Sequence, residues 1–263
     1  MGAAFTPREM IDRLVAFDTT SRGSNLALID FVAEYLKGHG LKPQLIPNAE
    51  NTKANLLVTL GPDQPGGIIL SGHTDVVPVD DQPWDTDPFT VVEQDGKLYG
   101  RGTADMKSFS AVALALVPEF LSRPLKTPIH IALSYDEEVG CLGVRPMIAE
   151  IARNLPRPKL AIIGEPTDMQ VVNAHKGIRS FRTTVTGREA HSSQTDKGVN
   201  AVMTAAELIV YLSSLAEDMR KRGDPSGRFD PPYTTTQAAT IEGGTALNIL
   251  ARHCTFQWEF RFL

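Results

Sequence analysis

The chain has 263 residues, of which 42% are hydrophobic, and its formal net charge is -5 at pH 7. This length suits one large domain or two ordinary ones, with enough apolar residues for a buried core. The acidic balance, without any dense Lys/Arg block, excludes the charge pattern of nucleic-acid-binding proteins. The longest apolar stretch, residues 111–117, is too short for a membrane span.

The cysteine content and the N-terminal sequence predict a cytoplasmic protein. Two cysteines, Cys141 and Cys254, are too few for a disulfide framework, which fits a reducing compartment. Residues 1–10 lack the basic start and the apolar run of a signal peptide. We therefore expect neither secretion nor membrane association.

From residue 7 to residue 163, segments with helical periodicity alternate with short apolar runs that are typical of buried strands. Helices are predicted over residues 7–17, 25–38, 106–121 and 142–153, and strands over residues 55–60, 67–72, 129–135 and 160–163. Strands that alternate with helices predict an α/β fold with a mostly parallel sheet flanked by helices. We assign residues 1–177 to this first domain.

The pattern changes after Gly177, where strands with strict polar-apolar alternation begin. Such strands are predicted over residues 179–186, 234–242 and 252–263, with a long amphipathic helix over residues 199–222. The alternation is typical of a sheet with one solvated face. Residues 178–263 are thus predicted to form a smaller α+β domain. Three strands and one helix leave part of such a sheet uncovered, so we expect this domain to be incomplete and the chain to be C-terminally truncated.

Three of the predicted strands end in side chains that bind metal ions. The strand before residue 73 leads into His73 and Asp75, the next into residues 136–138, and the last into Glu165. Asp105 follows a Gly-rich segment just before a helix. The carboxyl ends of parallel strands converge on one crevice. Two carboxylates about 4 Å apart repel by roughly 4 kcal/mol at an effective dielectric constant near 20, so this convergence predicts bound divalent cations.

Each of these residues also has a purely structural interpretation. His73 and Asp75 share one face of an extended segment, so Asp75 can fix the ring tautomer, but such a pair can also be structural. The position of the pair at a strand end beside Gly72 favours the metal site. Asp105 fits a helix N-cap as well as a ligand that bridges two ions.

The adjacent Glu137 and Glu138 diverge on an extended segment, which suggests one ligand and one general base. The alternative is a solvated acidic turn, although the strand before it is strongly apolar. Glu165 fits either a ligand or a loop carboxylate. His191 fits a surface position or a hydrogen-bond donor to an oxyanion. Residues 243–248 fit a tight turn or a loop that contacts the substrate.

Together these segments resemble the two-zinc aminoacylase and carboxypeptidase-type metallohydrolases over nearly the whole chain. The resemblance rests on motifs at the predicted strand ends and in the second domain. They are Ser71-Gly72-His73-Thr74-Asp75, Gly100-Arg101-Gly102-Thr103-Ala104-Asp105-Met106-Lys107, Asp136-Glu137-Glu138-Val139-Gly140, Gly164-Glu165-Pro166-Thr167, Ala174-His175-Lys176-Gly177 and Thr186-Gly187-Arg188-Glu189-Ala190-His191-Ser192-Ser193.

The resemblance implies a site for two zinc ions, which cobalt or manganese ions could also occupy. His73 and Glu165 would hold one ion, Glu138 would hold the other, and Asp105 would bridge them. Asp75 would orient His73. The family takes one further His ligand from a C-terminal part of the catalytic domain that has no counterpart here, so we expect an incomplete second metal position.

The resemblance also implies hydrolysis of the amide bond of a small N-acyl amino acid, with Glu137 as the general acid/base. The second domain would be a lid that forms a homodimer, so that His191 reaches the neighbouring subunit's site and Asn248 contacts the substrate. An acetylated amino acid is the leading expectation. A succinylated or other acyl amino acid, a dipeptide, and an inactive metal-binding fragment are the alternatives.

Overall fold

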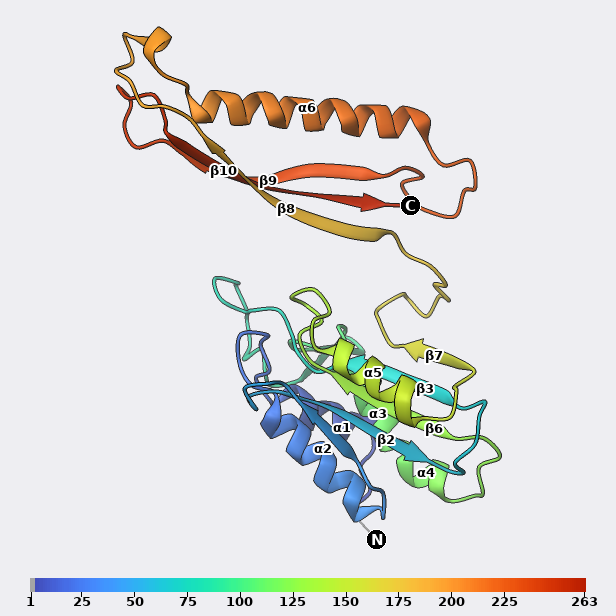
Figure 1. The fold of residues 1–263 in the computed structure, drawn as a ribbon. Coiled ribbons are helices and arrows are strands. Elements are labelled where there is room, and N and C mark those ends of the chain that lie inside the picture. Colours follow the sequence, from blue (N-terminus) through green and yellow to red (C-terminus); the bar gives the residue numbers. More distant parts are fainter. Residues whose placement is uncertain (1–2) are drawn as a thin grey trace. The chain divides into compact units, whose positions relative to one another are not determined.

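The computed structural model describes residues 3–263, which form two compact units (Figure 1). The first unit extends to Met169, and the second comprises Gln170–Leu263. The division falls somewhat before residue 177, where the change of sequence pattern suggested a boundary. None of the helices within residues 3–263 is both long and apolar enough to cross a membrane.

The first unit is built on a five-stranded sheet with the strand order β1-β2-β6-β3-β7. Its strands are β1 (Gln44–Pro47), β2 (Ala54–Leu60), β3 (Ile68–His73), β6 (Ile129–Ser134) and β7 (Leu160–Ile163). Strand β3 lies between β6 and β7 and runs parallel to both. Strand β2 is antiparallel to β1 and to β6. The predicted α/β class is confirmed, and the sheet is mixed.

Helices cover both faces of this sheet and enclose its core. They are α1 (Pro7–Val15), α2 (Leu26–Gly38), α3 (Lys107–Ala115), α4 (Val117–Leu121) and α5 (Val144–Asn154). Leu56 and Ile131 pack with α1 to α4 on one face, whereas Leu57 and Ala132 pack with Met147 of α5 on the other. Alternation along β2 and β6 thus supplies two apolar faces, and the helix-sheet-helix layering follows from it.

Two local features differ from the sequence prediction. The helix predicted over residues 106–121 is divided at Leu116, because Pro118 lies in the first turn of α4, where its missing N–H does no harm. The hairpin of β4 (Val92–Gln94) and β5 (Lys97–Tyr99), like β1, was not predicted. Its turn contains Asp95 and Gly96, both with positive φ, which is typical of a tight hairpin turn.

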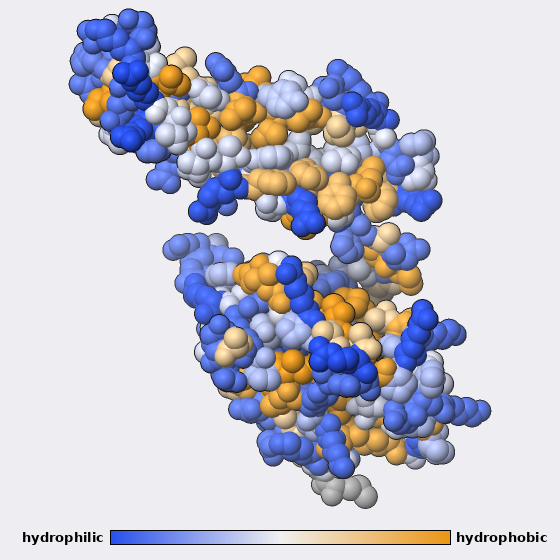
Figure 2. All heavy atoms as spheres, viewed as in Figure 1, coloured by the Kyte–Doolittle hydropathy of each residue, from blue (hydrophilic) through white to orange (hydrophobic). Residues whose placement is uncertain are grey.

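The second unit is an antiparallel sheet in the order β8-β10-β9 with one long helix on it. Its elements are β8 (Gly177–Thr186), the short 3-10 helix η1 (Thr195–Lys197), α6 (Ala201–Arg222), β9 (Thr235–Gly243) and β10 (His253–Phe262). Ala201 and Ala205 of α6 pack with Cys254 and Phe256 in the core. Apolar side chains also reach the surface of both units (Figure 2), and on α6 they include Met203, which is 65% exposed.

Candidate metal centre

His73 ends β3 with a buried imidazole ring whose two nitrogens face different partners. The Nδ1 atom lies 2.9 Å from the Asp75 carbonyl oxygen and 3.5 Å from Asp75 Oδ1. The Nε2 atom lies 2.9 Å from Asp105 Oδ1 and 3.8 Å from Glu165 Oε1. Asp75 thus fixes one side of the ring, and Nε2 faces the carboxylates. Nε2 is therefore the atom that a cation among these carboxylates would meet.

Asp105 reaches this position from the loop between β5 and α3. Helix α3 begins at Lys107 with Met106 as its N-cap and has no side-chain cap, so the N-cap interpretation of Asp105 is wrong. The Lys107 amide donates to the Gly102 carbonyl oxygen at 2.9 Å. Gly102 has a φ of +89°, and a Cβ atom there would lie 3.0 Å from a Val76 methyl group. This tight turn directs Asp105 towards His73.

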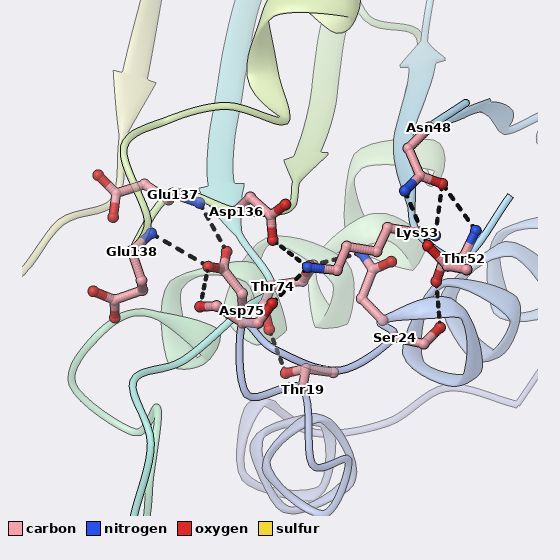
Figure 3. A network of polar contacts seen from close by, with 12 residues as sticks. Thr19, Ser24, Asn48, Thr52, Lys53, Thr74, Asp75, Asp136, Glu137 and Glu138 are labelled. Carbon is pink, nitrogen blue, oxygen red and sulfur yellow. Dashed lines mark hydrogen bonds and ion pairs between the residues drawn. The ribbon is translucent and has the colours of Figure 1, made fainter. Parts of the chain in front are cut away.

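The Asp75 carboxylate connects the end of β3 to the acidic loop after β6 (Figure 3). Its Oδ1 atom accepts from the Glu137 amide at 3.1 Å, and its Oδ2 atom accepts from the Glu138 amide at 3.2 Å. The Ser21 hydroxyl donates to Oδ2 at 2.7 Å. Burial disfavours the charged form, but the hydrogen bonds from His73, Ser21 and the Glu137 amide outweigh it and lower the pKa of Asp75.

These contacts bring five of the predicted site residues of the first unit into one cluster. His73, Asp105 and Glu138 offer donor atoms that all lie within 4.8 Å of one another, and so do His73, Glu137 and Glu165. One imidazole nitrogen with several carboxylate oxygens is a donor set that zinc accepts. Cobalt and manganese accept the same donors, so this set fits a divalent ion without fixing its identity.

The charges of the cluster favour a bound cation or, without one, bound protons. Burial raises the pKa of Glu138 and of Glu165, and the nearby Asp105 carboxylate raises both further. Burial disfavours the charged His73 ring, but Asp75 and Glu165 outweigh burial and raise the pKa of His73 to about 9. Divalent cations would replace these protons, because metal ligands must be deprotonated.

Some residues of this region carry no signal in the sequence. Ser21 lies in a loop after α1, yet its hydroxyl holds Asp75. The exposed Cys141 directs its thiol to Glu137 Oε1, with Sγ at 3.3 Å. Burial and the Glu137 carboxylate raise the pKa of this thiol, which favours its protonated form.

His191 and Asn248 lie in the second unit, on neighbouring segments. His191 forms an isolated β-bridge with Ile249. The Ser192 amide donates to the Asn248 carbonyl oxygen at 3.0 Å, and His191 Nδ1 lies 2.8 Å from the Ser193 hydroxyl. Asn248 is thus held near His191 by the backbone. The roles predicted for both residues, towards a substrate and a neighbouring subunit, stay predictions.

The fold and the cluster together define the class of this protein. In the first unit, helices flank an α/β sheet whose parallel strands β3, β6 and β7 end at a group of one imidazole and four carboxylates. Ligands of open α/β sheets bind outside the carboxyl ends of such strands. This is the architecture of a metal-dependent hydrolase with an α/β fold.

Comparison with known proteins identifies the family to which this chain belongs. Residues 69–251 match the model of Peptidase family M20/M25/M40, and the chain belongs to this family. Over 248 residues it is 41% identical to the acetylornithine deacetylase of Proteus mirabilis. This alignment covers 94% of this chain and 62% of that protein. It is 37% identical to the acetylornithine deacetylase of Pasteurella multocida, with 96% of this chain and 67% of the relative covered. The chain thus spans less than two thirds of the first relative.

Solved structures show the same fold at low sequence identity. An M20 family metallo-carboxypeptidase from Sulfolobus solfataricus superposes with a TM-score of 0.78 at 15% identity, over 98% of this chain and 71% of that chain. A tripeptidase from Staphylococcus aureus superposes with a TM-score of 0.69 at 22% identity, over 99% and 67%. The family predicted from the strand-end motifs is therefore confirmed by sequence, and the fold by structure.

Proposed function

We propose that the complete protein is a zinc-dependent amide hydrolase that removes the acetyl group from N2-acetyl-L-ornithine and releases L-ornithine and acetate, a step of arginine biosynthesis. The carboxylate-imidazole cluster at the ends of β3, β6 and β7 carries this proposal, because it can hold divalent ions at the carboxyl ends of parallel strands. Identities of 37% to 41% to proteins named acetylornithine deacetylase support the choice of substrate.

The proposed metal ligands follow the geometry of the cluster. His73 would serve one ion through Nε2, because its Nδ1 atom is already engaged by Asp75. Glu165, 3.8 Å from Nε2, would share that ion. Glu138 would hold the other ion, and Asp105 would bridge the two positions. Bound zinc supplies positive charge that polarises the acyl carbonyl and lowers the pKa of water.

The proposed general base is Glu137, whose carboxylate lies in the same cluster. It would take a proton from the attacking water as the water oxygen bonds to the acetyl carbon. It would then give that proton to the ornithine nitrogen as the C–N bond breaks, which gives acetic acid and a neutral amine. Transfer of the remaining acid proton to the amine then leaves acetate and the ammonium form of ornithine. His191 would donate a hydrogen bond to the developing oxyanion in the site of a neighbouring subunit, and Asn248 would contact the substrate.

We also propose that the complete protein acts as a cytoplasmic homodimer. The two cysteines are both free, which suits a reducing compartment. The exposed apolar side chains of α6, among them Met203 and Val210, suit a surface that a second subunit covers. Analytical ultracentrifugation of the complete protein should give twice the monomer mass, and a monomer at micromolar concentration would contradict this.

Replacement of the general base separates catalysis from metal binding. In the complete protein, Glu137→Gln should abolish turnover of N2-acetyl-L-ornithine while zinc content stays at the wild-type level. Glu34→Gln alters an exposed glutamate of α2 that pairs with Lys37, and should leave the rate unchanged. An active Glu137→Gln variant would contradict the assignment.

The substrate needs its own comparison. Rates of hydrolysis should be higher for N2-acetyl-L-ornithine than for N-succinyl-diaminopimelate, simple acyl amino acids or dipeptides. A higher rate for one of the other compounds would contradict the proposed substrate but not the proposed mechanism.

A further inference from the structure

A salt bridge lies directly behind the acidic loop, outside the proposed ligand set. Lys53 Nζ pairs with the Asp136 carboxylate, and the two side chains are only 15% and 17% exposed. Lys53 comes just before β2, whereas Asp136 follows β6 and precedes Glu137 (Figure 3). Lys53 Nζ also donates to the Ser21 carbonyl oxygen at 2.5 Å. One ammonium group thus ties together three segments of the first unit.

The turn before β2 holds Lys53 in place without help from the cluster. The Asn48 side-chain oxygen accepts from the Thr52 amide at 2.8 Å and from the Lys53 amide at 3.0 Å. The Asn48 amide in turn donates to the Lys53 carbonyl oxygen at 2.9 Å. Ser24 adds a hydroxyl hydrogen bond to the Thr52 carbonyl oxygen. The backbone that presents the ammonium group is therefore fixed by its own contacts.

Asp136 determines the direction in which the acidic loop leaves β6. Its φ of 56° lies in the left-handed region, which few residues other than glycine adopt. Beyond this turn, the amides of Glu137 and Glu138 both point to the Asp75 carboxylate. The Leu142 amide closes the loop on the Asp136 carbonyl oxygen at 3.0 Å. The conformation of one residue therefore orients two adjacent carboxylates.

Ser21 closes the contacts into a ring. Its carbonyl oxygen accepts from Lys53, and its hydroxyl donates to Asp75. Asp75 accepts from both glutamate amides, and the backbone leads back through Asp136 to Lys53. Every contact of this ring is made by the protein itself, without a metal ion. The ring can therefore hold the loop in place before any cation binds.

We propose that Lys53 and Asp136 are positioning residues that hold the acidic loop so that Glu137 and Glu138 face the metal centre in advance of metal binding. The roles of the two glutamates rest on the proposed function, whereas the contacts that position them do not. An ion pair at the rim of a protein would add a little stability and leave the loop unchanged. A positioning pair should instead alter the loop itself.

Amide hydrogen exchange of the metal-free chain, resolved by NMR, tests this directly at Glu137 and Glu138. Lys53→Met should accelerate exchange of both amides by about ten- to hundredfold, the range expected for loss of a hydrogen bond to a charged group. Asp136→Gly keeps the left-handed backbone accessible and removes the ion pair, so it should have the same effect. Lys53→Arg should restore exchange to near the wild-type rate.

A matched control is Arg8→Met, which removes the exposed ion pairs of Arg8 with Asp12 and Glu93 in the same unit. It should leave both glutamate amides unchanged. The proposal is overturned if Lys53→Met or Asp136→Gly leaves the two amides at the wild-type rate. It is also overturned if Arg8→Met accelerates them equally, because the effect would then report general loss of stability.

Cobalt binding gives a second readout that does not depend on turnover. Titration of the chain with Co2+, followed by its visible absorption, should show about tenfold or more weaker binding in Lys53→Met, with an altered spectrum, and recovery in Lys53→Arg. Wild-type affinity and spectrum in Lys53→Met would overturn the proposal. If the complete protein does not cleave acetylornithine, the proposed function fails while exchange and cobalt binding still decide the positioning role.

Discussion

Folding of the metal-free chain holds a proton on His73, and the stability that this proton contributes should be lost as the pH rises above 6.5. The Asp75 and Glu165 carboxylates overcome the effect of burial and raise the pKa of this ring from 6.5 to about 9. A group whose pKa is higher in the folded state stabilises that state while it is protonated. The contribution is complete below pH 6.5 and is lost as the pH rises through 9.

The expected magnitude follows from the size of the shift. Each pKa unit corresponds to about 1.4 kcal/mol, so the shift to about 9 corresponds to about 3 kcal/mol. The His73 side chain is 1% exposed, so solvent screening does not reduce this figure much. Because the pKa values of Glu138 and Glu165 are also raised, these groups act with the same sign, from pH 4.5 upwards. Asp75, whose pKa is lowered, contributes a constant amount in this window. The buried Lys107 acts with the opposite sign, because burial lowers its pKa to about 7 and the folded state gains stability as the pH rises above that value.

Urea unfolding between pH 6 and pH 10 in the presence of a chelator measures this dependence. The chain has two tryptophans, Trp84 in the first unit and Trp258 in the second, so Trp258→Phe leaves one fluorescent reporter in the unit that contains His73. Relative to His73→Gln, the free energy of unfolding of the wild-type sequence should fall by about 3 kcal/mol between pH 6.5 and 9. The comparison between the two sequences removes the opposing contribution of Lys107, which is the same in both. With saturating zinc the wild-type sequence should lose this contribution of His73, because the neutral ring is the ligand.

His73→Gln is the control, since it keeps a polar side chain and cannot titrate. Its metal-free stability should lack the fall between pH 6.5 and 9. A difference in stability between the two sequences that stays constant across that window would refute the reasoning. So would an equal fall in His73→Gln, because another group would then be responsible.

Two further predictions concern the same strand end. Zinc binding at pH 7.5 should release about one proton from His73, which calorimetry in two buffers of different ionisation heat can measure. Zinc binding without proton release would contradict the raised pKa of His73. Gly72→Ala should lower the free energy of unfolding by about 1 to 3 kcal/mol, because its Cβ atom would lie 2.4 Å from Ser110 Oγ and 3.0 Å from Met106 Cε. Urea denaturation measures the second effect, with the exposed Ser122→Ala as a control that should be near neutral.

The strand-end residues could be predicted from the sequence because their signal is local. Each of β3, β6 and β7 is a short apolar run that passes directly into a polar segment, and parallel strands bring such ends together. The sheet order could not be predicted in this way. Strand β2 pairs antiparallel with β6, and that choice depends on contacts between residues far apart in the chain. The short edge strand β1, with four residues, has too little periodicity to be recognised.

Asp105 shows where a local pattern stops being sufficient. An acidic residue after glycines and before a helix is typical both of an N-cap and of a ligand, so the sequence leaves the two open. The difference lies in the backbone. Helix α3 begins at Lys107, whose amide bonds to Gly102, and the carboxylate of Asp105 therefore turns to His73 and leaves the helix end. Only the course of the loop decides between the two interpretations.

Lys53 and Asp136 show a second limit of prediction from sequence, which concerns residues that orient the metal ligands. They lie 83 positions apart, and Lys53 sits in a polar turn that has the composition of an ordinary surface turn. The ligands can be found from motifs because chemistry demands particular side chains at strand ends. The residues that orient those ligands need only contact the backbone of the loop that carries them. Many different side chains, at many positions in the sequence, could make such a contact. The orientation of Glu137 and Glu138 therefore depends on the ion pair between Lys53 and Asp136, which belongs to no motif. Removal of this ion pair should impair metal binding although every proposed ligand is still present in the sequence.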